Sequence, residues 1–374
     1  MIPYGRQSID GDDIKAVVEI LNSDYLTTGP AVDRFEEAVT GFCSAEYGVA
    51  VANGTAALHA AVFAAGIADG DEVITTPMTF AATSNAVLFQ RGQVVFADVD
   101  ESTLLIDPDK VEQKITQKTK AVIAVDYAGQ PCDYKRLREI ADRHELILIS
   151  DACHSIGGFC DGKPVGSLAD ITCFSFHPVK HITTGEGGMV VTDNKEFADR
   201  ARIFRNHGIT TDHRQRMENG AWFYEMTELG YNYRITDIQC ALGISQLKKL
   251  PGWIERRNRI AERYDREFRN IPEIEPLGQK DNILNAYHLY VINLSEKLDR
   301  NQIFSELRAG GIGVNVHYIP VHLHPYYTRE LNTSRGLCPV AEKVYENIIS
   351  LPVYPALTDE QQTEVIEKVK AAVS

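Results

Sequence analysis

Between residues 45 and 195 the chain alternates short apolar runs, rich in β-branched residues, with segments that have helical spacing of apolar positions. Several runs are apolar at consecutive positions, as expected for strands that are covered on both faces. Helix candidates such as DYKRLREIADRHE fill the gaps between them. The pattern predicts a mostly parallel sheet with helices on both faces. Seven strands are expected, at YGVAVAN, DEVITTP, QVVFADVD, AVIAVDY, LILISDA, DITCFSF and GGMVVTD.

The pattern changes in the last third of the chain. Residues 236–268 are apolar at helical spacing, with Pro251 as the expected break or kink, and this stretch is predicted to link two domains. Beyond it, a strand-like YHLYVINL mixes with helices such as NQIFSELRAGG and TDEQQTEVIEKVKAAV, which is typical of a smaller α+β domain. We therefore expect a large domain over residues 1–245 and a small C-terminal domain over residues 246–374.

Composition narrows the class of protein. A chain of 374 residues that is 44% apolar and 24% charged can bury a core large enough for two domains. The net charge of -14 argues against nucleic acid or an anionic membrane as the main partner, so an anionic ligand needs a locally basic pocket. Neither a secretory leader nor a membrane-spanning stretch is recognisable, which predicts a cytoplasmic protein. Seven cysteines at irregular spacings predict free thiols rather than a disulfide framework.

Ligands of open α/β sheets bind at the carboxyl ends of strands, and the first chemically interesting place of this kind is VANGTAALHAA. Asn53 and Gly54 are expected to form a tight turn, and Thr55 can cap the alanine-rich helix that follows. The start of such a helix binds phosphate through its unpaired amides and its dipole. Taken alone, the motif is explained more simply by a capped helix without a ligand.

Two further strand ends carry groups of complementary chemistry. LILISDACHS ends at Asp151, with His154 three residues later, and a carboxylate at the end of a buried strand is costly unless it is paired or hydrogen bonded. A helix cap is the alternative role for this carboxylate. DITCFSFHPVKHITTGEGGMVV carries Lys180 in the loop after Ser175. Most lysines are solvated surface residues, but the flanking apolar strands place this one near the mouth of the sheet.

A phosphate-binding turn, a buried carboxylate and a sheltered lysine on one crevice are what pyridoxal 5′-phosphate requires. The lysine forms a Schiff base with this cofactor, and the carboxylate keeps the pyridine nitrogen protonated. The sequence therefore predicts a pyridoxal-phosphate enzyme in which Lys180 and Asp151 are catalytic.

At these residues the sequence resembles the nucleotide-sugar aminotransferases of the DegT/StrS family, which have the fold-type I architecture of pyridoxal-phosphate transferases. The resemblance runs almost from end to end. It implies transamination, because relatives that deoxygenate sugars carry histidine where this chain has Lys180. The matching segments are YLTTGPAVDRFE, NGTAALHAA, PMTFAATSNAV, DACHSIGG, SFHPVKHITTGEGGMVVT, GYNYRITDIQCALGISQLKKL, HYIPVHLHPYY and SLPVYPALTDEQ.

The resemblance also implies residue roles. Lys180 carries the Schiff base, Asp151 binds the pyridine nitrogen, and His154 lies on the hydroxyl side of the ring. Phe80 resembles the aromatic residue that stacks on the ring. Asn232, in GYNYRI, resembles an asparagine that reaches the phosphate bound in a neighbouring subunit, which implies a homodimer with shared active sites. The remaining cofactor-binding residues are Gly54, Thr55, Ala56 and Ser175, of which the glycine, the threonine and the serine hold the phosphate.

The segments SFHPVKHITTGEGG and IPYGRQSI are similar to those of members that aminate a UDP-linked 4-keto-6-deoxy amino sugar in pseudaminic acid synthesis, with L-glutamate as donor. Two alternatives remain open. One is an aminotransferase for a different keto sugar nucleotide, either another 4-keto isomer or a 3-keto sugar. The other is a non-catalytic regulatory protein of the same fold, against which the intact Lys180 and Asp151 argue. A dinucleotide-binding oxidoreductase is not supported, because no G-x-G-x-x-G follows the first strand.

The softer signals are basic and aromatic loops. Residues 205–208, residues 213–216 and Arg234 could supply the positive field that a diphosphate needs, although a solvated surface role is simpler for each. The segment VNVHYIPVHLHPYY contains His317, Tyr318, His322 and His324 but no carboxylate or cysteine at ligand spacing. We therefore expect no metal site there, and interpret the segment as a loop that lines the substrate.

Overall fold

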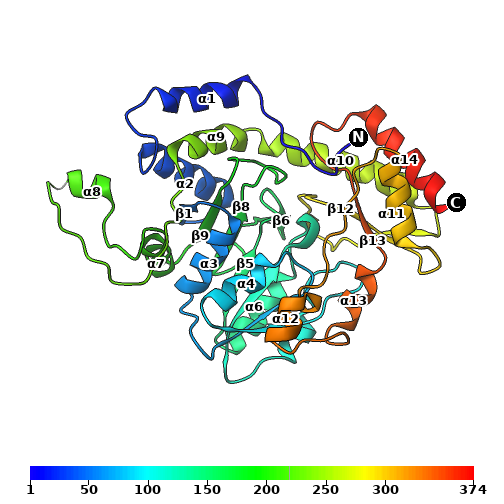
Figure 1. The fold of residues 1–374 in the computed structure, drawn as a ribbon, viewed down its shortest axis with the longest axis horizontal. Coiled ribbons are helices and arrows are strands. Elements are labelled where there is room, and N and C mark those ends of the chain that lie inside the picture. The colour runs from blue at the N-terminus through cyan, green and yellow to red at the C-terminus, as the bar shows by residue number, and fades with distance from the viewer. Residues whose placement is uncertain (219) are drawn as a thin grey trace.

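The computed structural model describes residues 1–218 and 220–374 and is built around one seven-stranded sheet (Figure 1). The strand order is β1-β9-β8-β5-β4-β2-β3. β9 runs antiparallel to β1 and β8, and the other neighbours pair in parallel, so the predicted mostly parallel sheet is confirmed. Its strands coincide with the seven apolar runs: β1 (Tyr47–Val51), β2 (Glu72–Thr75), β3 (Gln93–Phe96), β4 (Thr119–Val125), β5 (Ile147–Asp151), β8 (Ile171–Ser175) and β9 (Gly188–Thr192).

Both faces of this sheet are covered, which explains the consecutive apolar positions. Along β4, Val122 enters one core and Ile123 the other, and along β5 the same holds for Leu148 and Ile149. On one face the core is completed by α3 (Gly54–Ala64), α4 (Ala82–Phe89) and α7 (Lys195–Arg205). On the other face lie α2 (Pro30–Cys43), α5 (Pro108–Glu112), α6 (Tyr134–Arg143) and α9 (Asp237–Leu247).

The predicted helical stretch 236–268 is two helices. α9 ends at Leu247 and α10 (Leu250–Phe268) begins three residues later. Pro251 lies in the first turn of α10, where its missing amide hydrogen costs no hydrogen bond, so the break precedes the proline. Helix α1 (Gly11–Leu21) packs against α9 (Figure 1).

The C-terminal part contributes to two cores. Its antiparallel sheet of β10 (Ile274–Pro276), β12 (Tyr290–Leu294) and β13 (Ile348–Leu351) packs with α10, α11 (Arg300–Ala309) and α14 (Asp359–Val373). In contrast, α12 (Pro325–Glu330) and α13 (Pro339–Tyr345) pack into the core of the large sheet. The smaller elements are α8 (His213–Glu218), β6 (Phe159–Cys160), β7 (Lys163–Pro164), β11 (Ile283–Leu284), η1 (Tyr127–Gly129) and η2 (Val321–Leu323).

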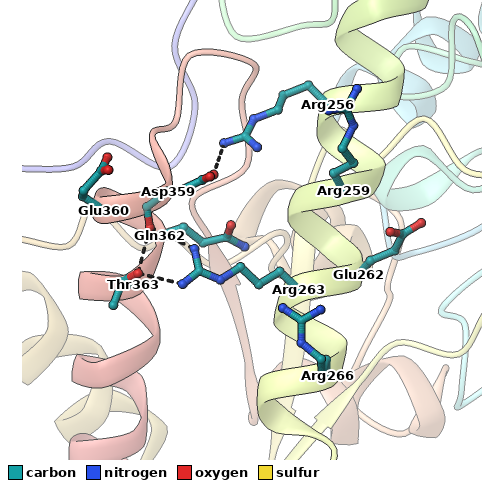
Figure 2. Close-up of a pocket in the computed structure, with 9 residues that line it drawn as sticks. All are labelled: Arg256, Arg259, Glu262, Arg263, Arg266, Asp359, Glu360, Gln362 and Thr363. Atoms are coloured by element: carbon teal, nitrogen blue, oxygen red, sulfur yellow. Dashed lines mark hydrogen bonds and ion pairs between the residues drawn. The ribbon is translucent and has the colours of Figure 1, made fainter.

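An arginine-rich groove separates α10 from α14 (Figure 2). Arg256 forms an ion pair with Asp359 at 2.8 Å. Arg263 donates to the main-chain oxygen of Asp359 at 2.9 Å and to Thr363 Oγ1 at 2.7 Å. These two side chains are thus engaged in joining α10 to the first turn of α14, which makes the groove part of the helix packing.

The structure bears on two expectations from composition, which concern the cysteines and membrane-spanning helices. All seven cysteines are free, and five of them are buried. No helix among the described residues is long and apolar enough to cross a membrane.

A buried carboxylate, Asp126, follows β4. It accepts hydrogen bonds from Ser155 Oγ at 2.6 Å, from Tyr134 OH at 2.8 Å and from the Cys132 amide at 3.0 Å. Burial outweighs these bonds and raises the pKa of Asp126 to about 6. The carboxylate therefore joins the end of β4 to α6 and to the turn after β5. Its contribution to the stability of the fold depends on pH.

We predict that Asp126→Asn removes a pH dependence of stability. Since the pKa of Asp126 is about 6 in the folded state and near 4 in the unfolded chain, the folded state binds the additional proton between these values. Stability from this group is present below about pH 4 and is lost as pH rises through the folded pKa. The free energy of unfolding of wild type minus that of the variant should fall by about 3 kcal/mol over this window.

Chemical denaturation of both proteins at a series of pH values measures this difference. The exposed Asp24→Asn is the matched control and should give a flat difference. A flat profile for Asp126→Asn as well would contradict the raised pKa.

Candidate active site

A cavity of about 530 Å³ lies at the carboxyl ends of β4, β5 and β8. Its wall combines the start of α3, the segment before α4, the loop after β8 and the segment 315–318. It brings together most of the residues that the sequence singles out, although they are far apart along the chain. These are Gly54, Thr55, Phe80, Asp151, His154, Ser175 and Lys180.

The start of α3 forms one end of the cavity, and here one expectation is wrong. The helix cap is Asn53, whose side chain accepts a hydrogen bond from the Ala56 amide at 2.8 Å. Thr55 instead lies inside the first turn and lines the cavity, so its hydroxyl does not cap the helix. Ala56 is buried and does not line the cavity, and its amide makes the capping hydrogen bond with Asn53.

Gly54 allows the helix start to approach β8 closely. A Cβ atom at this position would lie 2.8 Å from Ser175 Cβ and 3.0 Å from Ser175 Oγ, which is closer than side chains tolerate. The backbone of the first turn and the serine hydroxyl therefore face the same small volume. Helix amides, the helix dipole and a hydroxyl together form a cradle for an anion the size of phosphate.

The carboxylate of Asp151 is buried at the end of β5. It accepts a hydrogen bond from Thr83 Oγ1 at 2.6 Å and a longer one from the Cys153 amide at 3.3 Å. The Thr83 hydroxyl also pairs with that of Thr79 at 2.7 Å. This chain of hydroxyls orients the carboxylate, and sequence reasoning missed it. The sequence does contain a sign of this chain, because two threonines lie four residues apart in TFAAT at the start of α4.

Lys180 lies in the loop after β8, and its side chain lines the cavity. Desolvation lowers the pKa of Lys180 and outweighs the opposite effect of Cys153 and Asp151. A larger fraction of this amine is therefore neutral near pH 7, which a nucleophile requires.

The remaining wall is aromatic. His154 Nε2 and Tyr318 OH lie 3.1 Å apart, and burial holds the pKa of His154 well below its usual range, so the ring is neutral. Phe80 lines the cavity and is 63% exposed, so its ring is accessible to a ligand. His317 and Tyr318 line the cavity as expected. The expectation is wrong for His322, which is buried against Glu342 at 2.8 Å, away from the cavity.

The other predicted groups lie outside this cavity. Asn232 pairs with Asn206 in an isolated bridge, and Arg234 donates to the Asn206 side chain at 3.0 Å. Arg205, Arg214 and Arg234 line a separate cavity of about 370 Å³ between α2 and α7. The basic segments thus do not face Lys180 within one chain. The side chain of His213 lies outside the described residues. No group of three or more potential metal ligands occurs in the described part of the chain.

A mostly parallel seven-stranded sheet, with a lysine, a carboxylate and an anion cradle at one edge, defines a pyridoxal-phosphate transferase of fold type I. More particularly, the chain belongs to the DegT/DnrJ/EryC1/StrS aminotransferase family, whose sequence profile matches residues 7–370. It is therefore a sugar aminotransferase, and its cofactor is pyridoxal 5′-phosphate.

Three relatives illustrate the range of the family. The spore coat polysaccharide biosynthesis protein SpsC of Bacillus subtilis is 40% identical over 100% of this chain and 97% of its own length. The UDP-4-amino-4,6-dideoxy-N-acetyl-beta-L-altrosamine transaminase of Campylobacter jejuni is 38% identical over 95% of this chain and 93% of its own. The structure of Helicobacter pylori PseC, an aminotransferase involved in the biosynthesis of pseudoaminic acid, matches with a TM-score of 0.93 at 34% identity, covering 100% of this chain and 99% of PseC.

We predict that Thr83→Val weakens cofactor binding about tenfold, because a hydrogen bond to a charged group contributes about 1.5–3 kcal/mol. The valine matches the shape of threonine but leaves Asp151 without its closest donor. Titration of the apoprotein with pyridoxal phosphate measures the dissociation constant. Thr83→Ser keeps the hydroxyl and should bind nearly as tightly as wild type. Equal affinity for the valine and serine variants would remove this hydroxyl from the site.

Proposed function

We propose that this enzyme aminates a UDP-linked 4-keto-6-deoxy amino sugar, with L-glutamate as the amino donor, on a route to pseudaminic acid. The proposal depends on one observation above all: Lys180, Asp151 and the cradle at Gly54 line the same cavity. The resemblance to the Campylobacter transaminase and to PseC supports the choice of substrate.

The residues of the cavity fit the cofactor. The cradle formed by the first turn of α3 and Ser175 would hold the phosphate, and the close approach at Gly54 supports this role. Asp151 would bind the pyridine nitrogen, because it is a buried acceptor with a fixed orientation. Phe80 has an exposed ring with which to cover one face, and His154 has a buried Nδ1 without a partner to offer the ring substituents.

When bound, pyridoxal phosphate supplies an electron sink for the negative charge that develops at the α-carbon of the donor. Lys180 supplies the proton transfers. Its amine, whose pKa is lowered by desolvation, removes the α-proton from glutamate and later delivers a proton at the sugar carbon that receives the nitrogen. Asp151 would pair with the pyridine nitrogen, and its hydrogen bonds from Thr83 and Cys153 fix its orientation.

A second candidate function is amination of a different keto sugar nucleotide. SpsC, which belongs to spore coat polysaccharide biosynthesis, is somewhat more similar in sequence than the altrosamine transaminase. The chemistry at Lys180 would be the same, and only the sugar carbon and its configuration would differ.

We further propose a homodimer in which Asn232 contacts the phosphate bound in the other subunit. Its exposed position away from its own cavity supports this role. The segment around α8 projects from the body of the protein (Figure 1) and is rich in exposed apolar residues. Trp222 is 84% exposed, and Leu229 is 73% exposed. An apolar segment of this kind is typical of a surface that a partner covers.

The substrate prediction is tested with a panel of keto sugar nucleotides and L-glutamate. We expect the UDP-linked 4-keto-6-deoxy amino sugar that yields the altrosamine product to give the highest kcat/KM, with the product configuration determined by NMR. Lys180→Ala should lower turnover by a factor of about 10³ or more, because both proton transfers lose their base. A higher kcat/KM for a 3-keto sugar or for another 4-keto isomer would replace the proposed substrate by the second candidate.

Shared sites are tested by mixing two inactive variants, Lys180→Ala and Asn232→Ala. A hybrid dimer contains one site with both residues intact, so random reassociation should restore about a quarter of wild-type activity. As the control, each variant is taken alone through the same denaturation and refolding cycle. Should the mixture stay as inactive as its components while wild type recovers, Asn232 does not act across subunits.

A further inference from the structure

An aromatic cluster surrounds a buried histidine of α3, the helix whose first turn forms the anion cradle. His59 is 1% exposed, and its ring centroid lies 5.0 Å from that of Tyr231 and 5.9 Å from that of Tyr233. The two tyrosine rings are stacked on each other, with centroids 5.1 Å apart. Phe204 of α7 packs edge-on against the histidine ring at 4.8 Å. The cluster therefore joins α3 to α7 and to the segment 231–233.

Both ring nitrogens of His59 have hydrogen-bond partners. Nε2 pairs with Gln90 Nε2 at 2.8 Å, and Nδ1 pairs with Tyr233 OH at 3.1 Å. Because the amide nitrogen of Gln90 can only donate, Nε2 accepts, and Nδ1 carries the proton that it donates to Tyr233. Burial lowers the pKa of His59 to about 4, so the ring is neutral near pH 7 and keeps this arrangement. The histidine thus fixes the hydroxyl of Tyr233 from the side of α3.

The backbone of segment 231–233 is held at the same place. The Tyr233 amide donates to the Arg205 oxygen at the end of α7, at 3.0 Å. The Tyr233 oxygen accepts from the Ala52 amide at 2.8 Å, and Ala52 directly precedes the residue that caps α3. Main-chain and side-chain bonds therefore attach this segment to the beginning of α3 and to the end of α7.

Asn232 lies between the two tyrosines and projects away from the cluster. Its backbone is extended, since it forms an antiparallel bridge with Asn206. Side chains alternate along an extended segment, so two neighbours that both face His59 turn the side chain between them to the opposite side. Asn232 is accordingly exposed, whereas His59 is buried. The contacts of His59 with the two tyrosines therefore set the direction of Asn232.

We propose that His59 is a positioning residue that acts on the active site of the other subunit. It binds Tyr233 and packs against Tyr231, and in this way it holds Asn232 in the direction needed to meet the phosphate bound by the partner. The inference rests on the proposed role of Asn232 across subunits. One helix then serves two sites, because the first turn of α3 holds the phosphate of its own subunit and His59 supports the contact to the other.

The test measures cofactor binding and needs no turnover. Apoprotein is titrated with pyridoxal phosphate, and the absorbance of the Schiff base at Lys180 gives the dissociation constant. His59→Leu keeps an apolar side chain in the core but loses the bond to Tyr233. We expect about tenfold weaker binding, the scale of a lost hydrogen bond to a charged group. Tyr233→Phe keeps the ring and loses only the hydroxyl, so about threefold weaker binding is expected.

Phe63→Leu is the matched control for a change in the packing of α3. This ring belongs to the same helix and stacks on Phe204 at 4.3 Å. The variant should bind the cofactor as tightly as wild type.

Hybrid dimers show on which site His59 acts. One subunit carries His59→Leu, or Tyr233→Phe should the leucine variant not fold, and the other carries Lys180→Ala. The two subunits have different affinity tags, so the hybrid is isolated through both tags after reassociation. Its one site that can form the Schiff base takes Lys180 from the first subunit and Asn232 from the second. We expect this site to bind the cofactor as tightly as wild type, because that Asn232 has an intact His59 in its own subunit.

The proposal is overturned if the hybrid binds the cofactor as weakly as the homodimer of the same variant, since His59 would then act on the cradle of its own subunit. Wild-type affinity in both the His59→Leu and the Tyr233→Phe homodimers would overturn it as well. The mixture of Lys180→Ala with Asn232→Ala separates this inference from the proposed shared sites. If that mixture is active, a weakly binding hybrid removes only the role of His59, whereas an inactive mixture removes both.

Discussion

The active site depends on lowering the pKa of one lysine amine within the same cavity as a carboxylate. Lys180 and Asp151 have opposite charges in water, and a direct ion pair between them would fix the amine in its protonated form. Desolvation is the largest influence on Lys180 and lowers its pKa, while Asp151 acts in the opposite direction with a smaller effect. The donors to Asp151 are the Thr83 hydroxyl and the Cys153 amide, so its charge is satisfied without the lysine. Both groups line the cavity of about 530 Å³, so the lysine and the carboxylate are available to the same ligand.

The sheet provides this separation through its strand order. β5 and β8 are neighbours, with Asp151 opposite Cys173, so the carboxylate and the loop that carries Lys180 leave the same edge one strand apart. The start of α3 returns to this edge from the far end of the sheet, and Gly54 lets it lie against Ser175. Asp151 ends a buried strand and Gly54 begins a buried helix, whereas Lys180 lies in the loop after β8. The two cores on either side of the sheet therefore fix the carboxylate and the anion cradle, and the loop carries the lysine from the end of β8.

Much of this could be predicted from the sequence, because strands covered on both faces leave consecutive apolar runs and strand ends mark the ligand edge. What could not be predicted depends on geometry at single atoms. Asn53 and Thr55 are both good helix caps, and the extended backbone of Asn53, with φ of -168°, decides between them. Thr83 resembles an ordinary helix residue until its hydroxyl is seen on Asp151. His288 lies in a strand-like run, YHLYVINL, whose pattern indicates its burial but not its contacts with the tilted rings of two other histidines.

The same constraint explains why the cavity that holds the lysine contains neutral histidines and not further positively charged side chains. A lysine or arginine in place of His288 would lower the pKa of Lys180 further, but it would also attract Asp151 and the carboxylates of the donor. A carboxylate there would have the opposite effect and favour a permanently protonated amine. An imidazole whose own pKa is depressed by burial gives the cavity wall a polar group with no net charge.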